Sequence, residues 1–177
     1  MIDLAKTNSG YDLHELLSAL QKCIRRGLEY EAVHFAVELE EFNPTALWNR
    51  LKIIASEDVG CANPSMPTLI ETLHKNYSES KSKLNDDSYR LFVVNAVVCL
   101  CRSPKSRIVD DLLITVYLER QHGYRLPNIP DFALDGIHTL RATKEGRETW
   151  DKVENEPFPN PWKERAKELL AKHGKPT

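Results

Sequence analysis

The segment Arg102-Ser-Pro-Lys-Ser-Arg107 places three cations and two hydroxyls within six residues. Ser103–Pro104 is typical of a helix start, because serine caps free amides and proline suits the first turn. The free amides and the positive dipole end of such a start favour anions such as phosphate. The alternative is that the serines only cap the helix and solvent surrounds the cations. We predict a helix from Ser103–Pro104 to about Gln121, with a DNA or phosphate contact at Arg102, Ser103, Lys105, Ser106 and Arg107.

Glu57 and Asp58 form an adjacent acidic pair near the expected end of another helix. Carboxylates at that end oppose the negative pole of the helix dipole. The misfit indicates a tertiary partner, an arginine or the backbone amides of a neighbouring helix, for at least one of them. General acid–base catalysis would need further converging groups, which the sequence does not indicate.

The remaining chemistry-bearing residues form no recognisable site. Cys23, Cys61, Cys99 and Cys101 are expected to be reduced and mostly buried, and the Cys99-x-Cys101 pair lacks the second pair of a zinc site. The six histidines are isolated, and no phosphate-binding glycine loop, GxSxG elbow or HExxH pair occurs. We therefore expect no metal, no cofactor and no enzymatic activity from this chain.

The composition predicts one ordinary globular domain. The chain has 177 residues, of which 41% are hydrophobic and 28% charged, with a net charge of −2. That charge excludes a wholly basic nucleic-acid coat but not a local basic patch. The longest apolar run, residues 91–101, is too short to span a membrane, and the N-terminus lacks an apolar signal core. We expect a cytoplasmic protein without a membrane partner.

Helical periodicity dominates the chain, so the predicted fold class is all-α. Residues 1–10 are expected to be loose and residues 11–122 to form a helical domain. Within it, Trp48, Leu51 and Ile54 should pack against Leu16, Leu20 and Phe35. The expected helices follow Asp12, Glu29, Asn43–Pro44, Ser65–Met66–Pro67 and Asp87 or Ser88, ending near Arg26, Glu41, Gly60, Tyr77 and Cys101, with residues 78–87 as a linker.

The pattern changes from Gly123, where two proline-rich loops cover residues 125–130 and 156–161. A short helix is expected at 131–140, a turn at 145–150 and a last helix at Trp162–His173. We predict that residues 123–177 form an extension packed on the same domain, a proline-rich strap fixed by Phe132, Phe158 and Trp162. The predicted architecture is a compact array of about seven or eight helices with this strap.

Four segments together resemble the C-terminal helical region of the RarA/MgsA family, in the clamp-loader branch of AAA+ ATPases, which includes the eukaryotic Werner-helicase-interacting ATPase. They are residues 11–25 (YDLHELLSALQKCIR), 31–33 (EAV), 51–64 (LKIIASEDVGCANP) and 96–106 (AVVCLCRSPKS). The resemblance covers Tyr11 to Leu113. Its most specific part contains Ser56, Glu57, Asp58, Gly60 and Pro64, which we take as structural motif residues.

Three departures limit what the resemblance implies. The Walker ATPase core is absent from this chain, Asn49–Arg50 with Lys52 matches the family's double arginine only loosely, and residues after Gly123 do not match the family's tail. The family's region is an oligomerisation module, typically tetrameric, of an ATPase acting on DNA at stalled replication forks. Any ATPase activity would need a separate AAA+ module.

The resemblance therefore implies a non-enzymatic module that forms a dimer or tetramer and contacts DNA or a replication protein. Two alternatives stay open: a nucleic-acid-binding module that uses the basic helix start, and an enzyme of unknown type. Met1 and the tail at 172–177 favour a stand-alone protein over a fragment.

Overall fold

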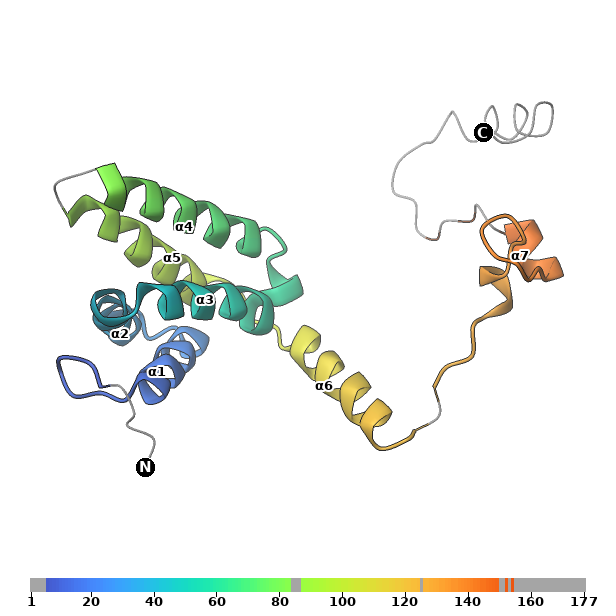
Figure 1. Cartoon of the computed structure of the whole chain (residues 1–177), viewed down its shortest axis with the longest axis horizontal. Coiled ribbons are helices and arrows are strands. Elements are labelled where there is room, and N and C mark those ends of the chain that lie inside the picture. The colour runs from blue at the N-terminus through green and yellow to red at the C-terminus, as the bar shows by residue number, and fades with distance from the viewer. Residues whose placement is uncertain (1–5, 84–86, 125, 150–151, 153, 155–177) are drawn as a thin grey trace. The chain divides into compact units, whose positions relative to one another are not determined.

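The computed structural model describes residues 6–83, 87–124, 126–149, 152 and 154. These residues form seven α-helices and short 3-10 and π turns, with isolated bridges in place of strands (Figure 1). The all-α prediction is confirmed. The chain divides into two compact units, Met1–Arg125 with helices α1 to α6 and Leu126–Thr177 with α7. None of the described helices combines the length and the apolar character that a membrane span requires.

Side-chain caps set the start of helices α1 and α3. In α1 (Leu13–Arg26) the Asp12 carboxylate accepts hydrogen bonds from the amides of His14 and Glu15. Helix α2 (Glu29–Phe42) follows, and in α3 (Pro44–Ile54) the Asn43 side chain accepts a hydrogen bond from the amide of Ala46. The bounds of α1 and α2 and the start of α3 agree with the predicted helices.

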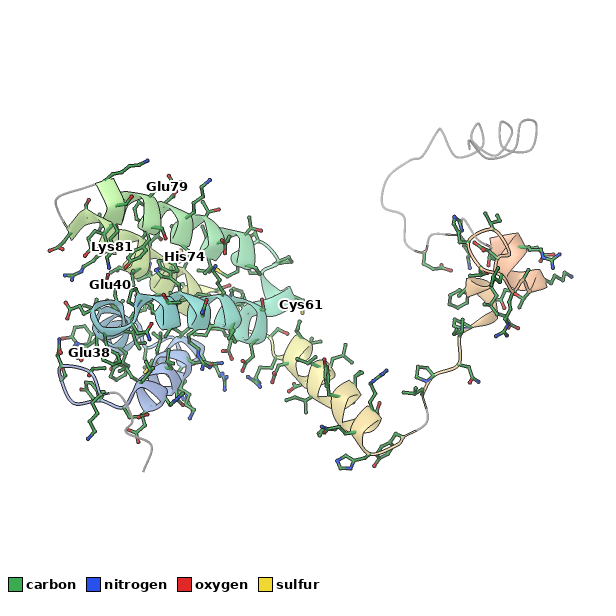
Figure 2. All side chains as sticks on the ribbon, in the orientation of Figure 1. Glu38, Glu40, Cys61, His74, Glu79 and Lys81 are labelled. Carbon is green, nitrogen blue, oxygen red and sulfur yellow. The ribbon has the colours of Figure 1, made fainter. Side chains whose placement is uncertain are left out.

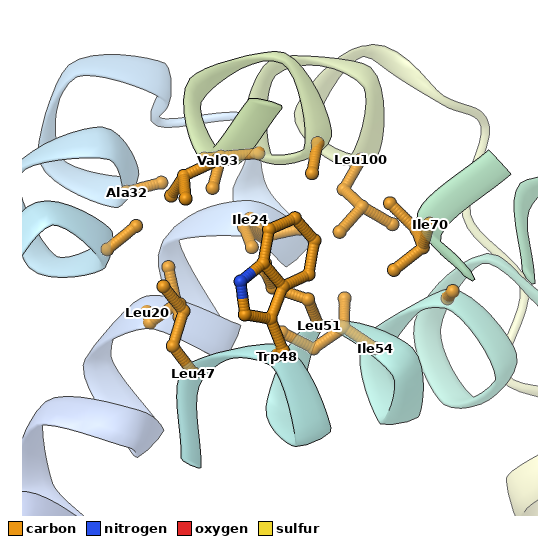
Figure 3. Packing of buried hydrophobic residues seen from close by; sticks show 14 of the residues in the cluster. Leu20, Ile24, Ala32, Leu47, Trp48, Leu51, Ile54, Ile70, Val93 and Leu100 are labelled. Atoms are coloured by element: carbon orange, nitrogen blue, oxygen red, sulfur yellow. The ribbon is translucent and has the colours of Figure 1, made fainter. Parts of the chain in front are cut away.

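The core lies where α1, α2, α3, α4 and α5 meet (Figure 3). Trp48, Leu51 and Ile54 are at most 1% exposed and belong to one cluster with Leu16 and Leu20, as predicted, and the partly buried Phe35 packs against it. Helix α5 (Arg90–Arg102) contacts α1, α2, α3 and α4. Its apolar residues therefore complete the core, which buries Val93, Ala96, Val97 and Leu100.

A buried carboxylate ties three helices together beside this core (Figure 2). Glu40 of α2 is 2% exposed and accepts hydrogen bonds from Tyr77 (2.6 Å) and Lys81 (2.7 Å) of α4 and from Arg90 (3.1 Å) of α5. Burial and the hydrogen bond to Glu40 raise the pKa of Tyr77 to about 12, so its hydroxyl keeps its proton and donates. Trp48 of α3 also packs against α4, where the centre of its ring lies 4.8 Å from the centre of the His74 ring.

Helix α4 (Met66–Lys83) is longer than predicted, because residues 78–83 are helical and not a linker. The Ser78 hydroxyl donates to the carbonyl of His74, and Lys81 packs one turn beyond Tyr77. The polar residues 78–83 are therefore the last turns of a helix that faces solvent on one side. On its other side Lys81 donates to Glu40 and Tyr77. The 3-10 turn η3 (Asp87–Tyr89) leads into α5.

Three further segments differ from the prediction. Helix α3 ends in a π turn, η1 (Ala55–Val59), and a 3-10 turn, η2 (Gly60–Ala62). Helix α6 (Ile108–Gln121) begins after Arg107, not after Ser103. Residues 6–10, expected to be loose, form a turn in which the Ser9 amide and hydroxyl donate to Glu38.

The second unit contains the 3-10 turn η4 (Asp131–Ala133) and helix α7 (Lys144–Thr149). The turn near 145–150 is thus confirmed as a helix. The prediction of a helix at 131–140 is wrong. The Asp135 carboxylate accepts hydrogen bonds from the amides of Ile137 and His138, and these bonds hold the segment in a turn. The predicted helix at 162–173, Phe158 and Trp162 lie outside the described residues, so the strap stays a prediction.

Candidate functional site

The π turn η1 places the two adjacent carboxylates. It adds one residue to the last turn of α3, and the amide of Gly60 closes it by donating to the carbonyl of Ala55. Asp58 becomes fully buried, whereas the Glu57 side chain is 25% exposed. Pi turns inside helices are frequent at functional sites, which makes this turn the natural centre of a site.

Two arginines and a glutamine hold the acidic pair. Asp58 accepts hydrogen bonds from Arg25 (2.5 Å), Gln21 (2.9 Å) and Arg107 (3.4 Å). Glu57 accepts from the same three side chains, at 3.3, 2.9 and 3.0 Å respectively. A buried charge needs such partners, so the prediction that an arginine holds at least one carboxylate is confirmed.

This network joins elements that are distant in sequence. Arg25 and Gln21 belong to α1, and the two carboxylates belong to η1. Arg107 directly precedes the first residue of α6. Arg50 of α3 donates to the side-chain oxygen of Gln21 (2.8 Å) and so orients its amide. Both carboxylates are engaged by cations, an arrangement typical of an architectural network.

The basic segment 102–107 does not start a helix. Ser103 has an extended backbone and follows the end of α5, and α6 starts at Ile108 without a side-chain cap. The expectation that Ser103 caps the helix with Pro104 in its first turn is therefore wrong. Tertiary contacts explain this, since the Ser103 hydroxyl accepts from Asn63 (3.3 Å) and the Ser106 amide donates to the carbonyl of Asp58 (2.8 Å).

The three cations of the segment have partners within the protein. Arg102 donates to both carboxylate oxygens of Glu29 (2.6 and 3.0 Å). Lys105 donates to the carbonyls of residues 100, 101 and 103, where a cation suits the negative end of α5, and burial lowers its pKa. Arg107 also pairs with Asp110. A phosphate contact at these residues stays a prediction. The helix start at Ser103 on which that prediction was based is not present.

The other motif residues lie around the same junction. Ser56 is exposed on η1, and Gly60 is the first residue of η2, directly after η1. Pro64 lies in the turn from η2 to α4, next to Asn63, whose side chain reaches both Ser65 and Ser103. The motif thus forms the connection on which α3, α4 and the start of α6 converge.

Helix α6 is the feature that sequence reasoning missed. The sequence predicted it as one helix of a compact array, but none of the residues of α6 is buried. A hollow of about 350 Å³ opens between α3 and α6, where Ile53, Val109 and Leu113 form its apolar wall. Figure 1 shows the helix leaving the α1–α5 bundle at one end. Eight of its large apolar side chains are 43–65% exposed: Ile108, Val109, Leu112, Leu113, Ile114, Val116, Tyr117 and Leu118.

The described residues contain no group of three or more metal-ligating side chains close enough to hold an ion. All four cysteines are free thiols. Cys61 is exposed (Figure 2). Its thiol contacts the Ser106 hydroxyl at 3.6 Å. Burial raises the pKa of Cys101 to about 11, which keeps this thiol protonated and weakens it as a ligand or nucleophile.

These features define the molecule as an all-α helical array with an arginine-held acidic π turn and an uncovered apolar helix. Over 95 residues the chain is 33% identical to "Replication-associated recombination protein A" of Bacillus subtilis (strain 168). The match covers 52% of this chain and 21% of the relative, so it spans about a fifth of that protein's length. The chain thus contains a region similar to RarA. No family model matches it.

Proposed function

We propose that this chain is a non-enzymatic assembly module of a replication- or recombination-associated protein, and that it forms a dimer or tetramer through α6 in the cytoplasm. The observation that carries the proposal is the exposure of eight large apolar side chains on one helix. Contiguous apolar surface of this kind marks an interaction site in a water-soluble protein. The similarity to RarA supports the replication and recombination setting, and with it contact with DNA or a replication protein.

A second copy of α6 fits this surface better than an unrelated partner. A two-fold axis perpendicular to α6 makes the two identical helices run antiparallel and bury the same surface of each. The helix carries Asp111 in its first turn and Arg120 in its last turn. Antiparallel pairing about such an axis sets each Asp111 near the partner's Arg120, while the apolar row between them is removed from water.

Light scattering coupled to size exclusion tests the assembly. A chain of 20.3 kDa should elute at twice or four times that mass at micromolar concentration. The double variant Leu112→Asp/Val116→Asp should return the mass of one chain, because it puts two charges in the proposed interface. Its helical circular dichroism should stay unchanged, since both side chains are exposed within the unit.

Thr115→Asp is the matched control. It adds one of the two negative charges to the same helix, at an exposed polar position beside Asp111 and Glu119. The oligomer should survive this change. A wild-type protein with the mass of one chain at micromolar concentration would overturn the proposal.

A further inference from the structure

The direction in which α6 leaves the bundle is fixed at one end of the helix. Its closest contacts with the rest of the unit are to the turns η1 and η2, and it also lines the hollow beside α3. Val109, in the first turn of α6, lies against Gly60, and a Cβ placed on that glycine would be 3.3 Å from Val109 Cγ2. The helix beyond this turn is exposed. Small rotations at the joint would therefore become large displacements at its far end.

Arg107 bridges this joint with one guanidinium group. It precedes the first residue of α6 and reaches back to Glu57 Oε1 (3.0 Å) and Asp58 Oδ1 (3.4 Å) in η1. Its other terminal nitrogen donates to Asp110 in the first turn of α6. Because a guanidinium is planar and its donors are fixed relative to one another, turning α6 against η1 breaks one set of these bonds.

The anchor of the bridge does not depend on Arg107. Asp58 retains Arg25 and Gln21 when Arg107 is removed, and Glu57 retains the same two partners. The buried carboxylate therefore stays paired in an Arg107 variant. Folding of the helical bundle and direction of α6 can thus be separated by experiment.

We infer that Arg107 is a positioning residue: its bonds to Glu57, Asp58 and Asp110 set the direction of α6 and thereby the geometry of assembly. The second half of this inference rests on the proposed self-association through α6. The first half concerns the single chain alone. It assigns the acidic pair a role in presenting an interface, beyond holding α1 against η1.

The direction of α6 can be measured without assembly, in the exposed-face variant Leu112→Asp/Val116→Asp. Residual dipolar couplings of backbone amides report the orientation of each helix relative to the others. In this background the couplings of α6 and of α1–α5 should fit one alignment tensor. Adding Arg107→Gln should leave α1–α5 unchanged and make α6 deviate from the common fit.

The assembly half is measured in the full chain by analytical ultracentrifugation. Arg107→Gln should weaken self-association by about tenfold or more, and Arg107→Lys, which keeps the charge but not the planar fork, should fall between. Arg102→Gln is the matched control, because it removes the same charge and an ion pair to Glu29 from the same segment but lies outside the joint. It should leave both readouts unchanged.

The possible results test the direction of α6, its link to assembly and the proposed function separately. Couplings of α6 that still fit the common tensor in the Arg107→Gln protein would overturn the inference that Arg107 sets the direction. A changed direction with unchanged association would overturn its link to assembly. A monomeric wild-type chain would defeat the proposed function, while the dipolar couplings would still decide the role of Arg107. Loss of helicity in both Arg107 variants would assign the residue to folding and overturn the inference.

Discussion

Asp58 is a fully buried carboxylate in the described part of the chain, and its environment explains why it is tolerated there. Its oxygens accept hydrogen bonds from Arg25, Gln21 and Arg107. The two arginines balance the negative charge of the carboxylate, and the three donors occupy its lone pairs. A buried pair of this kind contributes little over a well-packed apolar pair, but breaking it leaves a charge without compensation. Glu57 shares the same partners at the edge of the solvent.

Asp58→Ala should therefore destabilise the protein by about 1–3 kcal/mol, because Arg25 and Gln21 lose a buried acceptor and keep only Glu57. Glu57→Ala is the control from the same turn and should cost less than about 1 kcal/mol, as expected for a partly exposed ion pair. Urea unfolding at pH 7 measures both values. Equal losses in the two variants would show that burial does not distinguish the carboxylates.

Glu40 gives the fold a predictable response to acid. Burial acts to raise the pKa of its carboxyl group, but hydrogen bonds from Lys81 and Tyr77 and the charges of Lys81 and Arg90 outweigh it, so the pKa lies below its ordinary value. A carboxyl group with a lowered pKa stabilises the folded state above its unfolded pKa of about 4.3. That stabilisation is lost as the pH falls through the folded pKa.

Glu40→Gln should remove this part of the acid dependence. The difference in unfolding free energy between the wild-type protein and the variant should be largest above about pH 5 and shrink as the pH falls below about 4. Glu79→Gln, which affects an exposed pair with Lys75, is the control and should follow the wild-type curve. A difference that is independent of pH would contradict the assignment.

At the scale of elements, two similar start signals had different outcomes. Asn43–Pro44 and Ser103–Pro104 both join a capping residue to a proline, and both were predicted to start a helix. Asn43 caps α3 through the amide of Ala46. Ser103 instead donates its amide to Cys99 at the end of α5 and accepts from Asn63 with its hydroxyl. Tertiary contacts decided the second case, and local sequence does not encode them.

The π turn could not be predicted from periodicity either. Ile54, Ala55, Asp58 and Val59 are buried, and this spacing suits a continued α-helix as well as one with an extra residue per turn. The need of the acidic pair for a cationic partner was evident from its place near a helix end. That arginines from α1 and from the start of α6 supply it depends on the packing of the unit.

Gly60 tests how tightly this junction is built. Its backbone has φ 49° and ψ −131°, a conformation that side chains rarely adopt, and an added Cβ would lie 3.3 Å from Val109 Cγ2. Gly60→Ala should cost about 2–3 kcal/mol. Gly123→Ala, with φ 71° and no neighbour within 4 Å of the added carbon, should cost about 1 kcal/mol. Chemical denaturation compares them, and equal costs would show that Val109 does not constrain the joint.

On the scale of the whole molecule, the fold class followed from helical periodicity, while the exposure of α6 did not. A helix apolar over most of its circumference is usually buried within its own domain, and α6 was predicted as one helix of a compact array. Its residues are instead uncovered in the unit Met1–Arg125. Periodicity reports which side chains avoid water, but not whether the same chain or another copy covers them.

The second unit shows the same limit of local reasoning. Its described residues place Leu134 at 5% exposure, with the backbone of Gly146 in α7 so near that a Cβ there would lie 2.2 Å from the carbonyl oxygen of Leu134. The glycine is thus required for α7 to pack on η4. The chain between these elements was predicted to continue a helix to residue 140, and this close approach has no signal in periodicity.

The burial of Trp48 also gives the molecule an optical reporter. The sequence has three tryptophans, and the other two, at 150 and 162, belong to the second unit. With those two replaced by phenylalanine, the indole emission comes from Trp48 alone, which is 1% exposed in the core of the first unit. Its spectrum should shift to longer wavelength when that core opens to water. Fluorescence can therefore follow the melting of one unit in the intact chain.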